Sequence, residues 1–191
     1  MALEDYIYEK PVIETVRLTL RKLTRSDVPD LEKWMPDKSI YTYWGKGPGK
    51  TDKNPSLLFE KEKKPTKSFH LGIVLKSSGE VIGELWVYLI ENNRMAKVAI
   101  RFSKDYQGKG YATEALNAIT AFCFDNTELQ RLWTDVDVRN EASVRLLEKC
   151  GYKREGMIRQ GKMVSSWCDY YLYGLLKSEY NSEKISRKID I

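Results

Sequence analysis

One short stretch, residues 106–115 (YQGKGYATEA), constrains the fold more than any other part of the chain. Its two glycines follow an apolar–polar alternation over residues 95–102 and lead into residues 112–124, whose apolar side chains recur on one helical face. Another strand pattern follows over residues 131–138. A helix that connects two strands is typical of a parallel crossover, so the glycine turn is predicted at the carboxyl end of a strand with a parallel neighbour.

The glycine turn also has the chemistry of an anion site. The first backbone N–H groups of a helix have no partner within the helix, and the aligned peptide dipoles place roughly half a positive charge at that end. Gly108 and Gly110 lack the Cβ atoms that would keep a bulky anion from these amides, and Lys109 adds a positive charge at the rim. The turn is therefore predicted to hold a pyrophosphate.

The remaining patterns predict a mixed α/β fold in one domain of 191 residues. Residues 45–55 are rich in Gly, Pro and Lys and predict a surface loop that becomes ordered when substrate binds. Residues 181–191 form a polar tail. The predicted order is a strand at 16–23, a helix ending at Pro36, a weakly signalled helix at 56–63, strands at 69–75, 81–90 and 95–102, a helix at 112–124, a strand at 131–138, a helix opened by Asn140, and strands near 152–160 and 167–176.

Composition excludes several other classes of protein. The net charge is +5, from 32 Lys and Arg against 27 Asp and Glu in interspersed order, so we expect no nucleic-acid partner. Cys123, Cys150 and Cys168 are odd in number and widely spaced, which argues against a disulfide framework and a zinc site. We find no signal peptide and no apolar run long enough to span a membrane. We therefore expect a soluble, cytoplasmic protein without a metal.

Two motifs resemble the GCN5-related N-acetyltransferases (GNAT). Residues 107–112 (QGKGYA) match the Gln/Arg-x-x-Gly-x-Gly/Ala loop of that family, and residues 140–152 (NEASVRLLEKCGY) resemble its second motif, which opens with Asn and ends with Glu-Lys-x-Gly-Phe/Tyr. The resemblance extends over about residues 12–180. Residues 15–18 and 83–85, with the start of the helix at 112–115, resemble the branch that acetylates the N-termini of ribosomal proteins (RimJ/RimL-like).

The resemblance implies a mostly antiparallel sheet in which strands 95–102 and 131–138 splay apart to form a wedge for acetyl-CoA. The pantetheine arm would pair with backbone groups of Ile100, Arg101 and Phe102, and Asn140 and Ser143 would contact it from the opposite wall. The pyrophosphate would bind at the turn and at the helix that follows. The residues expected there are Gln107, Gly108, Lys109, Gly110, Tyr111, Ala112 and Thr113.

Acetyl transfer from this donor to a primary amine, with CoA as product, requires a deprotonated amine, an oxyanion donor and a proton for the sulfur. Many family members carry a Tyr acid where this chain has Leu147, so the resemblance suggests Ser143 as the acid, acting directly or through a water. Family members often carry a Glu that acts as the general base where this chain has Lys97. Glu84 on the adjacent strand is the substitute we predict, and deprotonation through water is an equal alternative; His70 is the single histidine.

Simpler structural roles compete with these assignments. Asn140 is also a good helix N-cap, and both roles can coexist. Asp135 and Asp137 share one face of a strand and are interpreted as structural or substrate-facing. Residues 45–51 (GKGPGKT) resemble a nucleotide-binding P-loop but have three residues instead of four before Gly-Lys, which argues against an NTPase.

Two other functions remain open from the sequence. One is a CoA-binding protein without transferase activity, because the usual acid and base are replaced. The other is an RNA- or ribosome-associated module that uses its lysine-rich loop. For a transferase, the branch resemblance favours a protein N-terminus as acceptor, with a small amine or an antibiotic as alternatives; segments 41–67 and 167–171 are expected to border the acceptor cleft. The chain is expected to be a monomer or a homodimer.

Overall fold

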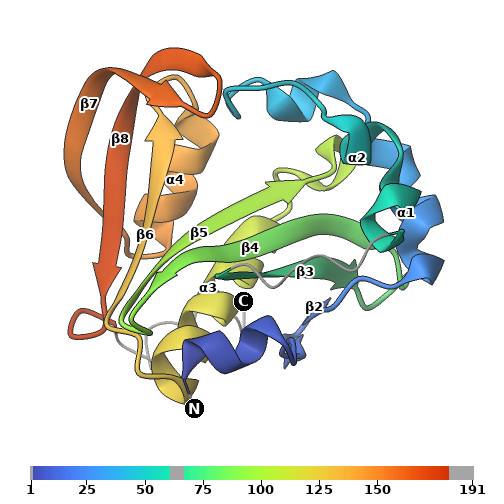
Figure 1. Cartoon of the computed structure of the whole chain (residues 1–191), viewed down its shortest axis with the longest axis horizontal. Coiled ribbons are helices and arrows are strands. Elements are labelled where there is room, and N and C mark those ends of the chain that lie inside the picture. The colour runs from blue at the N-terminus through green and yellow to red at the C-terminus, as the bar shows by residue number, and fades with distance from the viewer. Residues whose placement is uncertain (1, 61–66, 181–191) are drawn as a thin grey trace.

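A computed structural model of the chain describes residues 2–60 and 67–180, which form an eight-stranded sheet with helices on both faces (Figure 1). The strand order is β1-β2-β3-β4-β5-β6-β8-β7, and within this sheet only β5 and β6 pair in parallel. The strands are β1 (Ile13–Glu14), β2 (Leu18–Arg21), β3 (Ser68–Leu75), β4 (Val81–Glu91), β5 (Met95–Phe102), β6 (Arg131–Asp137), β7 (Lys153–Met163) and β8 (Ser166–Leu176). The α-helices are α1 (Val28–Trp34), α2 (Lys50–Lys53), α3 (Tyr111–Asn126) and α4 (Glu141–Lys149), and short 3₁₀ helices are η1 (Leu3–Ile7), η2 (Arg25–Asp27), η3 (Lys38–Tyr41), η4 (Pro55–Phe59) and η5 (Lys104–Tyr106).

The predicted mixed sheet and its parallel pair are confirmed, and two local predictions are wrong. The helix expected at 56–63 is only η4, and residues 61–66 lie outside the described residues, as does the predicted tail at 181–191. The loop expected at 45–55 contains α2, whose start is capped because the backbone N–H of Gly49 donates to Asp52 Oδ2 at 2.8 Å. Composition predicted a surface loop that becomes ordered on substrate binding, because residue types alone do not show that Asp52 pairs with Arg101.

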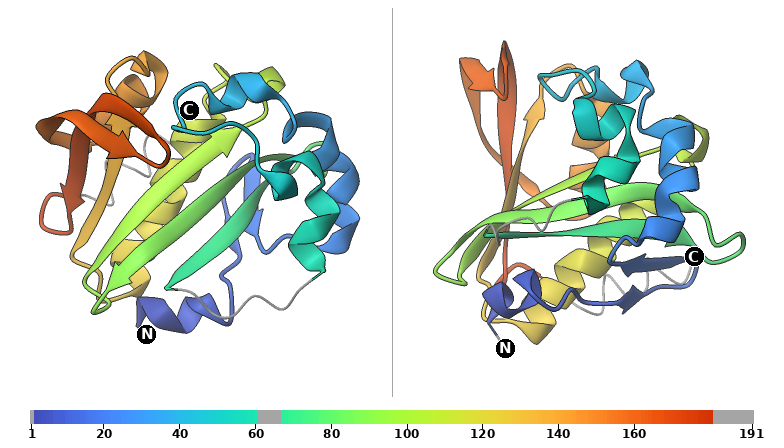
Figure 2. Two further views of the ribbon diagram at one scale, coloured as in Figure 1. Left: turned by 45° about the horizontal axis from the view of Figure 1, so that its top comes forward. Right: turned by 45° about the vertical axis from the view of Figure 1, so that its right-hand side comes forward.

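The two faces of the sheet are covered differently. Helix α3 lies against one face, and α1 and α2 lie against the other (Figure 2, right). The α3 side holds the main core, in which Ala115 and Ile119 are fully buried with Leu85 of β4. The apolar face predicted for the helix at 112–124 is therefore the face that packs against the sheet. Within the described residues no helix is long and apolar enough to cross a membrane.

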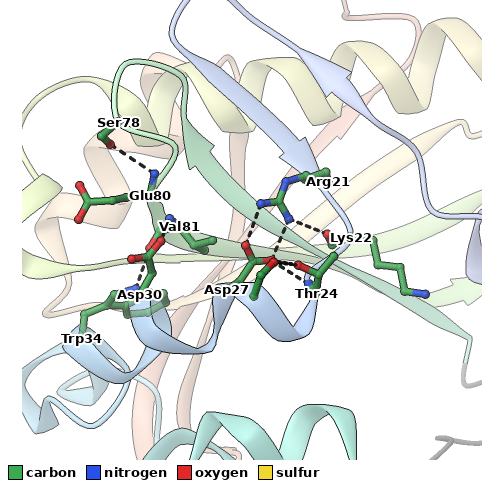
Figure 3. A network of polar contacts seen from close by, with 10 residues as sticks. Arg21, Lys22, Thr24, Asp27, Asp30, Trp34, Ser78, Glu80 and Val81 are labelled. Carbon is green, nitrogen blue, oxygen red and sulfur yellow. Dashed lines mark hydrogen bonds and ion pairs between the residues drawn. The ribbon is translucent and has the colours of Figure 1, made fainter.

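A polar network holds the first turn of α1 close to the sheet (Figure 3). The Asp27 carboxylate accepts two hydrogen bonds from the Arg21 guanidinium of β2, both at 2.8 Å. At the other end of α1, Trp34 Nε1 donates to the backbone carbonyl of Val81 at 2.9 Å. Helix α1 is thus anchored to the sheet at both ends, and it positions the beginning of the segment that follows it in the chain. We refer to residues 37–59, which run from there over the sheet, as the cap segment.

Candidate active site

Strands β5 and β6 lie side by side only at their beginnings. Their register runs from Met95 opposite Arg131 to Lys97 opposite Trp133, and beyond this point the strands diverge (Figure 1). The edge of β5 that faces β6 is therefore left without a strand partner in the described structure. Two adjoining cavities open in this wedge, an outer groove of about 630 Å³ and an inner cavity of about 320 Å³.

The outer groove contains the glycine turn and nearly all residues predicted to bind the cofactor. Gly108 and Gly110 have φ angles of 75° and 81°, in the left-handed region that favours glycine, and Gly110 is the N-cap of α3. A Cβ at Gly108 would meet nothing within 4 Å, so the backbone conformation rather than crowding requires glycine there. Lys109 is the one predicted residue that does not line the groove. The predicted residues that line it are Ile100, Arg101, Phe102, Gln107, Gly108, Gly110, Tyr111, Ala112, Thr113, Asn140 and Ser143.

Arg17, which the sequence analysis did not assign to the site, holds the glycine turn. Its Nη1 donates to the carbonyl of Lys109 at 3.1 Å, its guanidinium lies 4.6 Å from the ring centre of Tyr111, and its Nε donates to Glu114 Oε2 at 2.6 Å. Burial opposes ionisation of Glu114, but hydrogen bonds from Thr15 and Arg17 outweigh it and hold the pKa of Glu114 below its usual value. The turn thus keeps a guanidinium beside the free amides of α3.

Helix α4 contributes positive charge to the same groove. Arg145 and Lys149, four residues apart on the helix, both line it. Arg17 and Lys109 add two further cations at the glycine turn, beside the groove but not in its lining. Sequence reasoning missed Arg145 and Lys149, because lysines and arginines on the outward face of a helix look like ordinary solvated residues in the sequence. The arrangement suits a ligand with several phosphate charges.

Asn140 and Ser143 lie where the two cavities meet, and both line each of them. Asn140 Oδ1 accepts a hydrogen bond from the backbone N–H of Ser143 at 3.2 Å, which confirms the predicted N-cap of α4. The Asn140 amide nitrogen and the Ser143 hydroxyl have no hydrogen-bond partner among the described residues, so both can contact a ligand. Leu147 lines the inner cavity one turn further along.

The inner cavity lies deeper in the wedge and combines aromatic with charged walls. Asp137 forms an ion pair with Arg139 in this wall. Its carboxylate accepts hydrogen bonds from Arg139 Nε at 2.8 Å and Nη2 at 2.6 Å, and these bonds lower the pKa of Asp137. Lys97 donates to Asp135 at 2.7 Å. The lining residues are Tyr43, Trp44, Tyr88, Lys97, Val98, Ala99, Ile100, Leu116, Thr134, Asp135, Val136, Asp137, Asn140, Ser143, Leu146, Leu147, Lys162, Met163 and Val164.

The cap segment and the β7–β8 turn meet over this cavity. Ser165 Oγ donates to the carbonyl of Gly45 at 2.7 Å, and the two segments approach each other at the top of Figure 1. Gly45 has φ 69°, and a Cβ there would lie 2.1 Å from the carbonyl oxygen of Met163, so only glycine permits the contact. Of the two segments expected to border the acceptor cleft, residues 41–67 contribute Tyr43 and Trp44 to both cavities, whereas none of residues 167–171 lines either cavity and Trp167 is 68% exposed.

Glu84, the predicted base, lines neither cavity. Its side chain is 1% exposed, and its Oε2 accepts hydrogen bonds from Arg101 Nε at 2.7 Å and Nη2 at 2.5 Å. His70 Nε2 lies 2.8 Å from Oε1, although not in hydrogen-bond alignment. Burial opposes ionisation of Glu84, yet His70 and Arg101 lower its pKa below the usual value. A carboxylate that is buried and already paired in this way is better explained as part of a structural ion pair than as a general base.

Arg101 connects that ion pair to the cap segment. Its Nη2 also donates to Asp52 at 2.8 Å, and its Nη1 donates to the hydroxyl of Tyr41 at 2.7 Å. Its guanidinium lies 5.1–5.8 Å from the ring centres of three tryptophans, Trp34, Trp44 and Trp86. Trp44 lines both cavities, so the side chain of Arg101 helps to position the wall that separates them.

Comparison with known proteins agrees with this geometry. A family model described as an acetyltransferase (GNAT) domain matches residues 17–153. The uncharacterized N-acetyltransferase p20 of Bacillus licheniformis is 28% identical over 87% of this chain and 96% of its own length, and YdaF of Bacillus subtilis, provisionally named a ribosomal N-acetyltransferase, is 32% identical over 56% and 59%. The crystal structure of spermidine N-acetyltransferase from Vibrio cholerae in complex with CoA and spermine superposes with a TM-score of 0.74 at 25% identity, covering 86% of this chain and 98% of that one.

Proposed function

The chain belongs to the GNAT acetyltransferase family and is an acetyl-CoA-dependent N-acetyltransferase, and we propose that the amine it acetylates is the N-terminus of a peptide or protein. The observation that carries this proposal is the charge balance of the inner cavity. Its charged lining residues are two lysines and two aspartates, and Arg139 adds a further positive charge beside one of the aspartates. Such a wall offers no excess negative charge to a polyamine or an aminoglycoside. The four residues are Lys97, Lys162, Asp135 and Asp137.

The chemistry of the acceptor supports the same choice. An N-terminal amine titrates near 7.7–8.0, whereas a lysine-like alkylamine titrates near 10.4, so far more of the N-terminal amine is neutral at pH 7. An acceptor of this kind needs no strong base in the cavity. The aromatic walls formed by Tyr43, Trp44 and Tyr88 suit the first side chains of a peptide.

The proposed cofactor site follows the outer groove. Acetyl-CoA supplies an acetyl group activated as a thioester. The amides of residues 108–113 are proposed to bind its pyrophosphate, with Arg17 and Lys109 at the rim, and the backbone of residues 100–102 is proposed to pair with the pantetheine arm. This assignment rests on the left-handed glycines, the unpaired edge of β5 and the cations around the groove.

Ser143 is proposed as the proton donor for the sulfur, directly or through a water. Its hydroxyl lies at the junction of both cavities, whereas Leu147, at the position where many family members carry Tyr, has no proton to give. A thiol titrates near 8.5, so its thiolate leaves readily near neutral pH and a weak acid suffices. The amide of Asn140 is proposed to hold the cofactor arm beside it.

The deciding experiment measures thiol release from acetyl-CoA with a panel of acceptors. Peptides with free N-termini should be turned over with a kcat/KM at least about tenfold above that of spermidine or an aminoglycoside. A tenfold difference corresponds to about 1.4 kcal/mol of transition-state discrimination. A preference for spermidine would instead favour the second candidate, a polyamine acetyltransferase, to which the structural likeness to the Vibrio enzyme points. Acetyl-CoA binding without thiol release for any acceptor would favour a non-catalytic CoA-binding protein.

A further inference from the structure

An ion pair lies at the point where β5 and β6 separate. Lys97 is the last residue of β5 in register with β6, and it lies opposite Trp133. Asp135 is two residues beyond Trp133 in β6, so its side chain is on the same face of the strand as that of Trp133. Lys97 Nζ lies 2.7 Å from Asp135 Oδ2, and the two side chains are 11% and 24% exposed. Both line the inner cavity, so the pair is part of its wall and is not a surface contact.

Of the two aspartates in this wall, only Asp135 has a carboxylate oxygen that accepts no hydrogen bond from the described residues. Asp137 is 3% exposed and both its oxygens accept hydrogen bonds from Arg139. Within the described residues, the carboxylate of Asp135 receives a hydrogen bond from Lys97 alone, through Oδ2. Oδ1 of Asp135 therefore remains able to accept a hydrogen bond from a ligand in the cavity.

Lys97 is held in place by its surroundings. Its ammonium lies 5.5 Å from the ring centre of Tyr88 and 5.0 Å from that of Trp133, which are cation–π distances. Side chains on both sides therefore keep the positive charge beside Asp135. A fixed ammonium at this place cancels the charge of the carboxylate without occupying both of its oxygens.

We propose that Asp135 binds the acceptor nitrogen and that Lys97 limits the acceptor to a single positive charge. This inference rests on the proposed function, because it deepens the choice of a peptide N-terminus. The acceptor nitrogen arrives partly as an ammonium and attacks as a neutral amine after its proton has passed to water. In both forms its N–H groups can donate to Oδ1 of Asp135, the lining carboxylate oxygen that accepts no hydrogen bond from the described residues. With Lys97 beside it, the site filled by the ammonium form carries one net positive charge, and each additional charge on a polyamine would add repulsion.

The first test measures binding and does not depend on turnover. With CoA present, the affinity of the wild-type protein for a free N-terminal peptide is compared with that for the same peptide N-acetylated, by calorimetry. We expect a preference of about tenfold or more for the free amine, which a hydrogen bond to a charged group supplies, and we expect Asp135→Asn to abolish it. Equal binding of both peptides by the wild type, or an unchanged preference in Asp135→Asn, would overturn the role of Asp135.

The second test addresses Lys97. Lys97→Met should raise the ratio of spermidine to peptide kcat/KM by about tenfold, because it removes a positive charge next to the acceptor nitrogen. Lys153→Met is the matched control, since it removes the same charge from an exposed pair with Glu179 outside both cavities, and its ratio should stay at the wild-type value. An unchanged ratio in Lys97→Met, with CoA affinity and circular dichroism like the wild type, would overturn the role of Lys97.

These results separate the inference from the function on which it rests. If the wild type prefers spermidine to every peptide, the proposed acceptor class is wrong and so is the limiting role of Lys97. The role of Asp135 is then decided by the same binding comparison with spermidine and its N-acetylated form. If the wild type prefers peptides and neither variant behaves as described, the proposed function stands and the inference fails.

Discussion

Replacing Arg101 with Met tests whether a buried ion pair holds the cap segment on the sheet. The side chains of Arg101 and Glu84 are 7% and 1% exposed, so the variant removes the guanidinium that pairs with the Glu84 carboxylate in the interior. Breaking a buried pair in this way costs about 3–5 kcal/mol. For a domain of this size 1 kcal/mol shifts Tm by roughly 2–4 °C, so we expect Arg101→Met to lower Tm by about 10 °C. Part of this loss of stability comes from the missing hydrogen bond between Arg101 and Asp52.

The assay is urea and thermal unfolding followed by far-UV circular dichroism at pH 7. The matched control is Arg145→Met, which breaks an exposed pair with Glu141 and should change stability by no more than about 1 kcal/mol. The double variant Arg101→Met/Glu84→Met should recover much of the loss, because it removes the Glu84 carboxylate from the interior and leaves only the lost contact with Asp52. The reasoning is refuted if Arg101→Met loses no more than the control, or if the double variant is less stable than Arg101→Met.

Three further predictions concern the turn, the roof of the cavity and acid stability. Gly110→Val should weaken acetyl-CoA binding at least about tenfold in calorimetry, because a β-branched residue disfavours the φ of 81° that aims the α3 amides; Gly79→Val, at φ 76° in a turn outside both cavities, is its control. Gly45→Ala should raise the KM for the acceptor while the Kd for acetyl-CoA stays unchanged, because the new Cβ collides with the carbonyl of Met163. Glu84 has a lowered pKa in the folded chain, so its ionisation contributes stability above about pH 4.3 that is lost as the pH falls through the folded pKa; Glu84→Gln should flatten the acid limb of a stability–pH curve.

Each of these has a clear contrary result. Acetyl-CoA affinity that falls equally in the two valine variants would mean that Gly110 acts on folding and not on the phosphate site. An acceptor KM in Gly45→Ala equal to that of the wild type would show that the contact between the cap segment and the β7–β8 turn does not shape the acceptor site. An acid limb that is equally steep in Glu84→Gln would assign the proton uptake to other carboxylates.

The parts of the site that could be predicted from sequence are those whose residues are close together in the chain. Residues 106–115 contain the strand end, the glycines and the helix start, so spacing alone predicted the turn and the face of α3 that packs. The N-cap by Asn140 depends on a residue three positions away and was likewise predicted. Local geometry of this kind is fixed by backbone sterics and by unpaired amides, which the residue types reveal.

The parts that could not be predicted depend on long-range pairing. Glu84 in a strand is more often a surface residue than a base, and the sequence does not show that it is buried and paired with Arg101, 17 residues away. Asp52 meets Arg101 across 49 residues, which is why the composition of residues 45–55 predicted a loop. No periodicity in the sequence records such contacts, since they arise when separate elements pack on one face of the sheet.

Strand β5 explains how one scaffold serves both substrates. Side chains alternate along a strand, so Ile100 packs toward the α3 side while Arg101 points to the face covered by the cap segment. The backbone edge between them is the one proposed to pair with the cofactor arm, and it requires no particular side chain. The segments above the cavity can therefore change residues that line the inner cavity alone, such as Val164, without altering the cofactor edge, provided that a cation at position 101 still holds the cap segment. Substituting Val164 should accordingly change the choice of acceptor and leave the Kd for acetyl-CoA nearly constant, whereas substituting Arg101 should disturb both.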